Sequence, residues 1–220
     1  MFSQAEENYL KAIYALEIET STSVSTNLIA EQMQTKASSV TDMVKKLSDK
    51  RLVAYKKYQG VQLSDKGKNV ATSIVRKHRL WECFLVDKLN FSWDEVHDIA
   101  EQLEHIQSEE MIDRLDAYLD YPSVDPHGDP IPDKDGKITK RKKIQLSKLK
   151  ENQESVLLGV KDSSDEFLRY LDKKKIAIGK TIKILSIEPF DKSMQIKMNN
   201  TELIITEAVA ENLFVKEKDK

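Results

Sequence analysis

The sequence predicts a mostly α-helical protein that ends in a small β-domain. Three observations lead to this prediction. Apolar residues recur at spacings of three and four through most of residues 4–119. Four of the five prolines then gather between Tyr121 and Pro132. The remainder contains short apolar runs typical of strands, interrupted by two helical patterns.

The composition favours a cytoplasmic protein without a membrane partner. Its 220 residues allow one to three domains, and its 33% charged and 40% hydrophobic residues are ordinary for a soluble chain. No apolar run approaches the roughly 18 residues of a membrane span, and the acidic N-terminus does not resemble a signal peptide. The single cysteine, Cys83, excludes an intramolecular disulfide and indicates a reducing compartment.

The net charge of −2 hides two oppositely charged blocks. Residues 36–79 contain twelve Lys or Arg against three acids, whereas residues 82–120 contain twelve acids against two bases. A basic block followed by an acidic one predicts two partners, first a polyanion and then cations.

The N-terminal segment has the pattern of a helix-turn-helix. A capping box at Ser3–Glu6 opens a helix to about Glu19. A Ser/Thr-rich loop at 20–26 follows, then a short helix over Leu28–Met33 and another over Ser38–Ser48, which exposes Ser, Thr and Lys. A purely structural helical hairpin is the alternative.

The next segment favours DNA binding. Runs at Leu52–Tyr58 and Val61–Leu63 flank Gly60 and predict a β-hairpin, which makes the segment a winged helix. The second helix of the helix-turn-helix, predicted over Ser38–Ser48, would be the recognition helix. Residues near its start are expected to approach bases: Ser38, Ser39, Thr41 and Asp42. Lysines on that helix and the wing are expected to meet phosphates: Lys36, Lys45, Lys46, Lys56 and Lys57.

Acidic and imidazole side chains recur at helical spacing further on. On a helix, His97, Glu101, Glu104 and His105 fall within about a third of the circumference. His78 and Glu82, at i and i+4, share a face of the preceding helix. Carboxylate and imidazole ligands suit a divalent first-row cation. A solvated helix face is the alternative interpretation.

Local signals predict the remaining elements. Ser64–Asp65 caps a long helix over Lys66–Lys88, the capping box Ser92–Glu95 opens the helix that carries the candidate ligands, and Ser108 opens another. Beyond the proline-rich loop and a charged linker at 133–143, the strand-like runs and two helical patterns predict a small barrel: strands Val156–Val160, Gly179–Ile187, Met194–Met198 and Leu203–Thr206, and helices Ser164–Lys173 and Glu207–Asn212.

Six segments, in order along the chain, resemble the diphtheria-toxin-repressor family of metal-dependent transcription regulators, in particular its manganese-sensing branch: Val40–Leu47, Tyr58–Gly67, Lys77–Leu80, Asp94–His97, Leu103–His105 and Pro126–Pro132. The resemblance covers the whole chain. It implies a homodimer that, when loaded with Mn(II) or Fe(II), binds a palindromic operator in double-stranded DNA and represses metal-uptake genes. It also implies that the C-terminal barrel is SH3-like.

The resemblance also implies ligands. The main regulatory site would use Glu101, Glu104 and His105 with a first-helix residue, which falls at Asn8 where manganese sensors commonly have Asp and iron sensors Met. Glu101 stands where iron sensors have Cys, and oxygen in place of sulfur favours Mn(II), although Zn(II) will compete. A second site would draw on further residues: His78, Glu82, His97, Asp125, His127 and Asp162.

We therefore expect a mostly α protein with three domains: a winged helix-turn-helix at 1–72, a helical metal-binding and dimerisation domain at 73–143, and an SH3-like β-barrel at 144–220. It is expected to act as a repressor without enzymatic activity or a small organic substrate. Two alternatives stay open at this point. One is a hydrolase whose Glu/His cluster activates water, and the other is a winged-helix regulator that does not respond to metal.

Overall fold

The structure is a computed structural model that describes residues 2–20, 23–56, 59–139, 141–199 and 201–217. The predicted phosphate contact Lys57, the wing residue Tyr58 and part of the loop at 20–26 therefore lie outside the described residues. The chain forms two compact units. The first comprises Met1–Trp81, Glu101–Arg114 and Pro132–Ile138; the second comprises Glu82–Ala100, Leu115–Ile131 and Thr139–Lys220.

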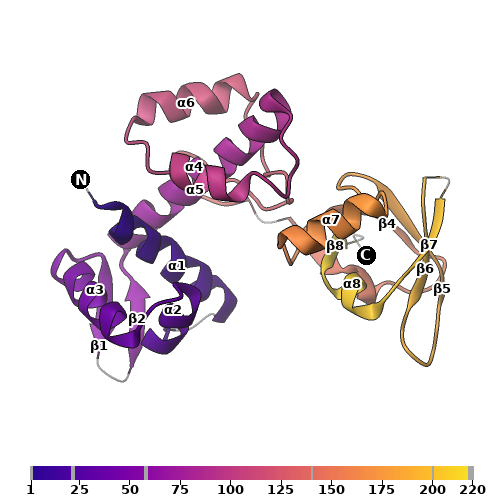
Figure 1. The fold of residues 1–220 in the computed structure, drawn as a ribbon, viewed down its shortest axis with the longest axis horizontal. Helices are drawn as coiled ribbons and strands as arrows, with labels where there is room; N and C mark the ends of the chain where they lie inside the picture. The colour runs from indigo at the N-terminus through magenta and orange to yellow at the C-terminus, as the bar shows by residue number, and fades with distance from the viewer. Residues whose placement is uncertain (1, 21–22, 57–58, 140, 200, 218–220) are drawn as a thin grey trace. The chain divides into compact units, whose positions relative to one another are not determined.

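The first unit begins with the predicted winged helix (Figure 1). Its elements are α1 (Gln4–Thr20), α2 (Thr26–Gln32), α3 (Ala37–Asp49), β1 (Val53–Lys56) and β2 (Gly60–Leu63). The capping box at the start of α1 is formed, since Ser3 N donates to Glu6 Oε2 (3.0 Å) and Glu6 N donates to Ser3 Oγ (3.3 Å). The two strands pair antiparallel, and Gly60 supplies the turn with a φ of +89°.

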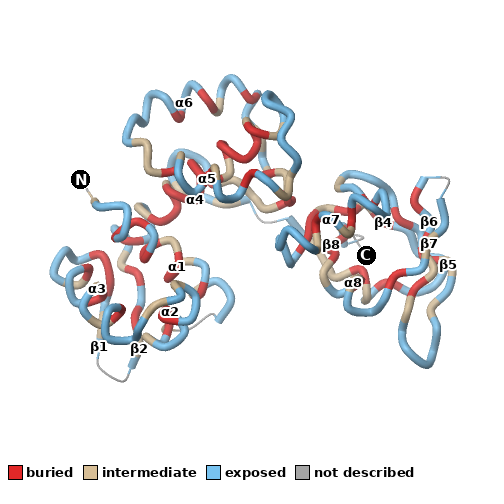
Figure 2. The backbone as a smooth tube through the Cα atoms, viewed as in Figure 1, coloured by how far each residue is buried: buried red, intermediate tan, exposed pale blue. Residues whose placement is uncertain are grey.

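One apolar core holds the winged helix together (Figure 2). Leu10 and Ile13 of α1, Ile29 of α2 and Leu47 of α3 are fully buried in it. These positions follow the three-and-four spacing that predicted the helices, so each helix buries one face and exposes the other. The exposed faces are left for polar contacts.

The rest of the first unit packs around the beginning of α4 (Asp65–Leu89). Arg76 and Lys77 on α4 are nearly buried and pair with acids of α6 (Glu109–Tyr118), at 3.2 Å to Asp113 and 3.1 Å to Glu109. The α6 cap was predicted correctly, because Ser108 Oγ accepts from Met111 N at 3.2 Å.

The predicted ligand-bearing helix is wrong in its extent. The Ser92–Glu95 capping contacts are formed, with Ser92 Oγ 2.7 Å from Glu95 Oε2, but they close a turn rather than a helix. Helix α5 spans only His97–Leu103, so Glu104 and His105 lie in the turn that follows it. A single helical face from His97 to His105 is therefore not formed.

The second unit contains the predicted C-terminal β-domain. Its antiparallel sheet has the order β3-β8-β4-β5-β6-β7. The elements are β3 (Lys143–Gln145), the short 3-10 helix η1 (Leu146–Lys148), β4 (Glu154–Val160), α7 (Asp165–Lys173), β5 (Thr181–Ile187), β6 (Met194–Met198), β7 (Thr201–Ile205), α8 (Glu207–Glu211) and β8 (Leu213–Lys216). Strands β3 and β8 were not predicted from the sequence.

Irregularities in β4 and β5 shape this sheet around its own core. The register shifts between Leu157 and Gly159 in β4 and between Ile184 and Ser186 in β5. Such shifts increase the local twist and bend of a strand. The resulting core is apolar and separate from that of the winged helix, with Leu157, Leu171 and Ile196 fully buried.

Among the described residues, no helix has both the length and the apolar character needed to cross a bilayer.

Candidate functional site

Six polar side chains of the first unit form what we call the first cluster, between α1, α4, α5 and the turn after α5: Glu7, Lys11, His78, Glu101, Glu104 and His105. Two of the three predicted main ligands, Glu104 and His105, are held there by residues far away in sequence. The turn after α5 and the first helix of the DNA-binding fold are thus joined by polar contacts.

On one side of the first cluster, the Glu7 carboxylate meets His105. Glu7 Oε2 lies 2.6 Å from His105 Nδ1, and Glu7 Oε1 accepts from Gln107 Nε2 at 3.0 Å. Both the Glu7 and the His105 side chains are nearly buried. A carboxylate at this distance favours a proton on Nδ1, so Nε2 is the nitrogen suited to bind a metal.

On the other side, the ammonium of Lys11 lies among three potential ligands. Lys11 Nζ is 2.7 Å from Glu104 Oε2, 3.4 Å from Glu101 Oε1 and 3.3 Å from His78 Nδ1. The same oxygen of Glu104 lies 2.6 Å from His78 Nδ1. The Glu104 side chain is only 1% exposed, whereas Glu101 is half in solvent.

These contacts keep Glu104 ionised. Burial by itself raises the pKa of Glu104, but the hydrogen bond to His78 and the charge of Lys11 outweigh it, and the net pKa is lowered. A buried carboxylate that remains charged requires a cation or several donors beside it. The donor set of the first cluster, carboxylate oxygens with imidazole nitrogens, fits a divalent first-row metal.

The first-helix residue predicted as a ligand, Asn8, is exposed on α1. Its neighbour Glu7 and the following Lys11 face the cluster instead. Neither was considered in the sequence interpretation. Their i, i+4 spacing, which puts both on one side of a helix, is the signal that could have identified them.

A second cluster lies in the second unit and consists of Glu82, Asp125 and His127. All three are buried, and one ligand atom of each lies within 4.8 Å of those of the other two. Burial lowers the pKa of His127, but Glu82, Asp125 and the Trp93 carbonyl together raise it to about 9. Without a cation at the cluster, this raised pKa favours the imidazolium form of His127, whose charge offsets part of the carboxylate charge.

The proline-rich loop positions Asp125 and His127 rigidly. Asp125 Oδ1 accepts from the backbone amides of His127 and Asp129, each at 2.9 Å. The His127 carbonyl accepts from Val160 N at 3.0 Å, which fastens the loop to β4. Gly128, with a φ of +88°, passes so close that a Cβ there would lie 2.0 Å from the Leu158 carbonyl oxygen. Only glycine fits at this position.

The other predicted ligands of the second site differ in their surroundings. His97 is exposed, with Nδ1 3.7 Å from Glu82 Oε1. His78 contacts Glu104 in the first cluster. Asp162 is exposed and its Oδ1 accepts from Ser164 N at 2.8 Å.

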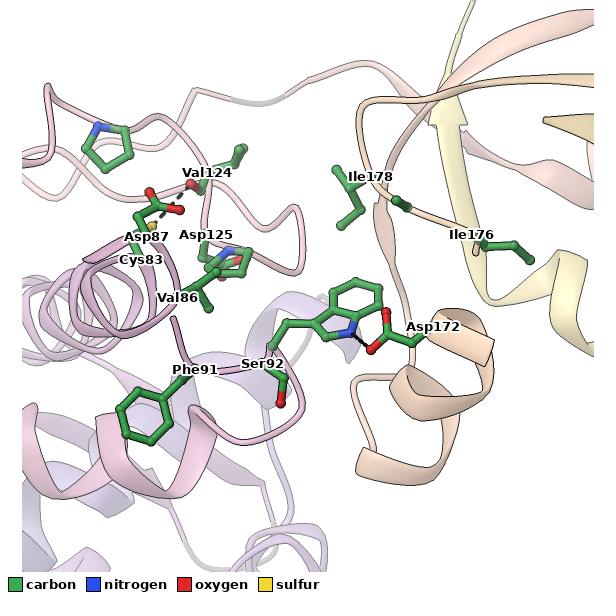
Figure 3. A pocket seen from close by; sticks show the side chains of 14 residues that line it. Cys83, Val86, Asp87, Phe91, Ser92, Val124, Asp125, Asp172, Ile176 and Ile178 are labelled. Carbon is green, nitrogen blue, oxygen red and sulfur yellow. Dashed lines mark hydrogen bonds between the residues drawn. The ribbon is translucent and has the colours of Figure 1, made fainter. Parts of the chain in front are cut away.

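A cavity of about 490 Å³ borders the second cluster (Figure 3). Asp125 and Cys83 line it on one side, Ile176 and Ile178 on the other. Trp93, whose carbonyl lies 2.8 Å from His127 Nε2, donates its indole N–H to Asp172 of α7 at 3.1 Å. Burial raises the pKa of the Cys83 thiol, which fits packing rather than reactivity.

The residues expected to approach bases lie at the start of α3. Ser38, Ser39 and Asp42 are exposed there. Thr41 is half-buried, and its hydroxyl donates to the Ala37 carbonyl at 2.9 Å. Three of the four side chains are therefore accessible to a groove.

The described lysines expected to meet phosphates are exposed: Lys36, Lys45, Lys46 and Lys56. Lys46 also has a structural role, because its ammonium lies 3.1 Å from the buried carboxylate of Glu6. Lys50 pairs with the same oxygen at 2.6 Å. Lys46 is thus less available to DNA than the others.

A winged helix together with a buried carboxylate and imidazole cluster defines the class of metal-binding, DNA-binding proteins. Comparison with known families agrees with this class. Residues 1–61 match the iron dependent repressor N-terminal DNA binding domain, residues 64–133 the iron dependent repressor metal binding and dimerisation domain, and residues 144–217 the FeoA domain.

Individual relatives point the same way. The iron-dependent repressor IdeR of Mycobacterium tuberculosis is 36% identical over 126 residues, which cover 57% of this chain and 54% of that protein. The matched segment thus spans about half the length of this relative. A manganese-dependent transcriptional repressor in complex with manganese has a TM-score of 0.83 and 31% identity, with coverage of 97% of this chain and 100% of that one. The structure of the manganese regulator SloR has a TM-score of 0.74 and 36% identity, and the match covers 97% of this chain and 98% of that one.

The chain therefore belongs to the iron-dependent repressor family, which includes the diphtheria toxin repressor.

Proposed function

We propose that this protein is a transcriptional repressor activated by Mn(II) or Fe(II). It acts in the cytoplasm as a homodimer, binds a palindromic operator in double-stranded DNA and controls metal-uptake genes. Its family membership and its winged helix support this proposal. The domain limits we propose are those expected from the sequence, 1–72, 73–143 and 144–220.

The observation that carries the proposal is the convergence in the first cluster. Glu7 and Lys11 belong to α1 of the DNA-binding fold, whereas Glu104 and His105 belong to the turn after α5. Side chains from the two segments meet at 2.6–2.7 Å. A cation held by Glu101, Glu104 and His105 is therefore linked to the fold that carries the recognition helix through the contact of His105 with Glu7.

We propose that Glu101, Glu104 and His105 hold the activating metal. When bound, the metal would supply a divalent positive charge to these two carboxylates and the imidazole. Glu104, buried and oriented by His78, fixes one ligand direction, and Glu7 orients the ring of His105. Whether Asn8 contributes its amide oxygen is tested by Asn8→Ala, which should weaken metal binding if it does.

We propose that Glu82, Asp125 and His127 form a second, ancillary site, with His97 and Asp162 as outer candidates. The support is their burial and their mutual approach within 4.8 Å for the first three residues. The backbone hydrogen bonds to Asp125 orient its carboxylate before any cation arrives.

Mn(II) is the metal we favour. Oxygen ligands at Glu101 and Glu104 suit a hard ion, and two of the structural relatives are described as manganese-dependent or manganese regulators. Fe(II) is the second candidate because other relatives are iron-dependent. Zn(II) competes by intrinsic affinity, so selectivity must come from geometry or from which metal activates.

In the proposed mechanism, bound metal restricts the positions of the two recognition helices, α3 of each subunit in the dimer. Two α3 helices of a dimer enter successive major grooves when they are about 34–36 Å apart on one face of the duplex. Contacts between α1 and the turn after α5 limit the freedom of the winged helix, and so raise the fraction of dimers with suitable spacing.

The experiment is operator binding at buffered free Mn(II), Fe(II) and Zn(II), on a palindromic operator selected from random duplexes. We expect Mn(II) or Fe(II) to tighten binding at least tenfold. Activation by Zn(II) alone would contradict the manganese or iron assignment. Equal operator affinity with and without metal would favour the alternative of a winged-helix regulator that does not respond to metal. Hydrolysis of an ester by the metal-loaded protein would support the hydrolase alternative. The similarity to repressors disfavours that alternative.

A further inference from the structure

The ammonium of Lys11 occupies a position within the first cluster that a metal ion would need. Its nitrogen lies 2.7 Å from Glu104 Oε2 and 3.4 Å from Glu101 Oε1, the carboxylates proposed as ligands. It also lies 3.3 Å from His78 Nδ1. Both carboxylates proposed as ligands are thus already in contact with one positive charge.

A metal ion and this ammonium cannot share the same carboxylate oxygen at low cost. A first-row cation binds carboxylate oxygen at roughly 2.0–2.2 Å, and Lys11 Nζ is 2.7 Å from that oxygen of Glu104. The two cations would repel each other across a few ångströms, in a place where the Glu104 side chain is 1% exposed and little water screens the charges.

The Lys11 side chain is able to leave. It is 21% exposed, so a path to solvent exists, and four flexible methylenes carry its ammonium. Once in water the ammonium recovers its full hydration. The Lys11 ammonium can therefore exchange with a second cation.

We propose that Lys11 is a tethered competitor cation that must leave Glu101 and Glu104 before a divalent metal binds, and that it sets the metal concentration at which the repressor responds. The inference rests on the proposed function, because it assumes that these carboxylates hold the metal. A tethered competitor acts at a high effective concentration. It lowers the affinity for all divalent ions by a similar factor.

This threshold determines which divalent ions occupy the site at their ordinary concentrations. Mg(II) dehydrates reluctantly and binds few direct protein ligands. A competitor of fixed strength keeps such a weakly binding ion off the site, while Mn(II) still displaces it. Removal of Lys11 should therefore admit Mg(II) at millimolar concentrations.

The experiment measures Mn(II) affinity in the full-length protein by competition with a fluorescent chelator. Lys11→Met keeps most of the length of the unbranched side chain and removes its charge, and we expect it to bind Mn(II) about 10- to 100-fold more tightly, equivalent to about 1.4–2.8 kcal/mol. Lys11→Arg keeps the charge and should bind no more tightly than the parent. The matched control is Lys50→Met, which removes a lysine from the buried acid Glu6 outside the cluster and should leave the affinity unchanged.

The outcomes separate the two proposals. A parent protein that binds Mn(II) in a Glu104-dependent manner, together with a Lys11→Met variant of unchanged or weaker affinity, overturns the role of Lys11 alone. A parent whose Mn(II) binding is unaffected by Glu104→Gln contradicts the proposed site, and the inference with it. If Lys11→Met fails to fold by circular dichroism, Lys11→Gln replaces it with the same expectation.

Discussion

The carboxylate of Glu7 lies 2.6 Å from Nδ1 of His105, 98 residues further along the chain. This pair gives the imidazole a fixed orientation and a preferred proton position, because a nearby carboxylate favours the proton on Nδ1. Gln107 in turn donates to the other oxygen of Glu7 at 3.0 Å. Glu7 thus orients the ring of His105, the proposed metal ligand, without itself being proposed as a ligand.

The first prediction concerns this positioning residue. Glu7→Gln should weaken Mn(II) binding about 10- to 100-fold, as is usual for a lost outer carboxylate. A glutamine amide can still contact the ring but holds it less firmly. Titration against a competing chelator measures the change, and it is accompanied by a check that the fold is intact.

The control for Glu7 is Glu19→Gln, which removes an exposed acid from the same helix. Equal losses of affinity in the two variants would mean that only net charge matters. Unchanged binding in Glu7→Gln would show that the contact with His105 has no bearing on the metal.

The second prediction concerns the number of metal sites. Glu104→Gln should remove the first-cluster site, and Glu82→Gln the second, because each loses a buried carboxylate at the centre of its cluster. Equilibrium dialysis with Mn(II) should then count two ions per chain in the parent and one in each variant. A count of two in Glu82→Gln would eliminate the second cluster as a site.

The third prediction concerns acid stability. The pKa of Glu6 is lowered from 4.5 to about 2, because hydrogen bonds and charge from Lys50, Ser3 and Lys46 outweigh the effect of burial, which raises it. A lowered pKa stabilises the fold at pH values above 4.5, and this contribution is lost as the pH falls from 4.5 through 2.

Glu6→Gln should therefore reduce the free energy of unfolding by about 1–3 kcal/mol at neutral pH. The difference from the parent should shrink below pH 4.5. Urea titrations at pH 7, 4 and 3 measure it. A difference that is constant across this range would show that the ion pairs of Glu6 do not stabilise the fold.

The fourth prediction concerns the DNA-binding surface. Lys36→Ala and Lys56→Ala should each reduce the slope of log affinity against log salt by about 0.9, and weaken specific and nonspecific sites alike. Lys46→Ala should change the slope less, because its ammonium is 3.1 Å from Glu6. Altered sequence preference with an unchanged slope in Lys56→Ala would contradict its assignment to phosphate.

The winged helix could be predicted closely because its signals act over a few residues. The Ser3–Glu6 capping box, the apolar spacing of Leu10 and Ile13, and Gly60 in the hairpin turn all behave as local rules require. The end of α5 could not be predicted in this way. Glu104 and His105 leave the helix for partners on α1 and α4, and those partners are invisible to a local pattern.

Non-local pairing also explains the missed strands. β3 and β8 are only three and four residues long, and they exist as strands because β8 pairs with both β3 and β4. The candidate site likewise depends partly on local sequence signals and partly on contacts between distant residues. Residue type and spacing predicted Glu101, Glu104 and His105 as ligands. The i, i+4 spacing of Glu7 and Lys11 could place them on one side of α1, but only the packing of α1 places them beside the predicted ligands.

We expect metal in the first cluster and operator DNA at the winged helix to stabilise the same state of the protein. Thermodynamic linkage then requires that each ligand increase the binding affinity of the other by the same factor. A tenfold increase corresponds to a coupling free energy of about 1.4 kcal/mol. The decisive measurement is the Mn(II) affinity of the full-length protein with and without saturating operator, beside the operator affinity with and without saturating Mn(II). We predict equal factors of at least ten in the parent and factors near one in Glu104→Gln. An Mn(II) affinity that saturating operator leaves unchanged, in a protein that still binds both ligands, would contradict the account.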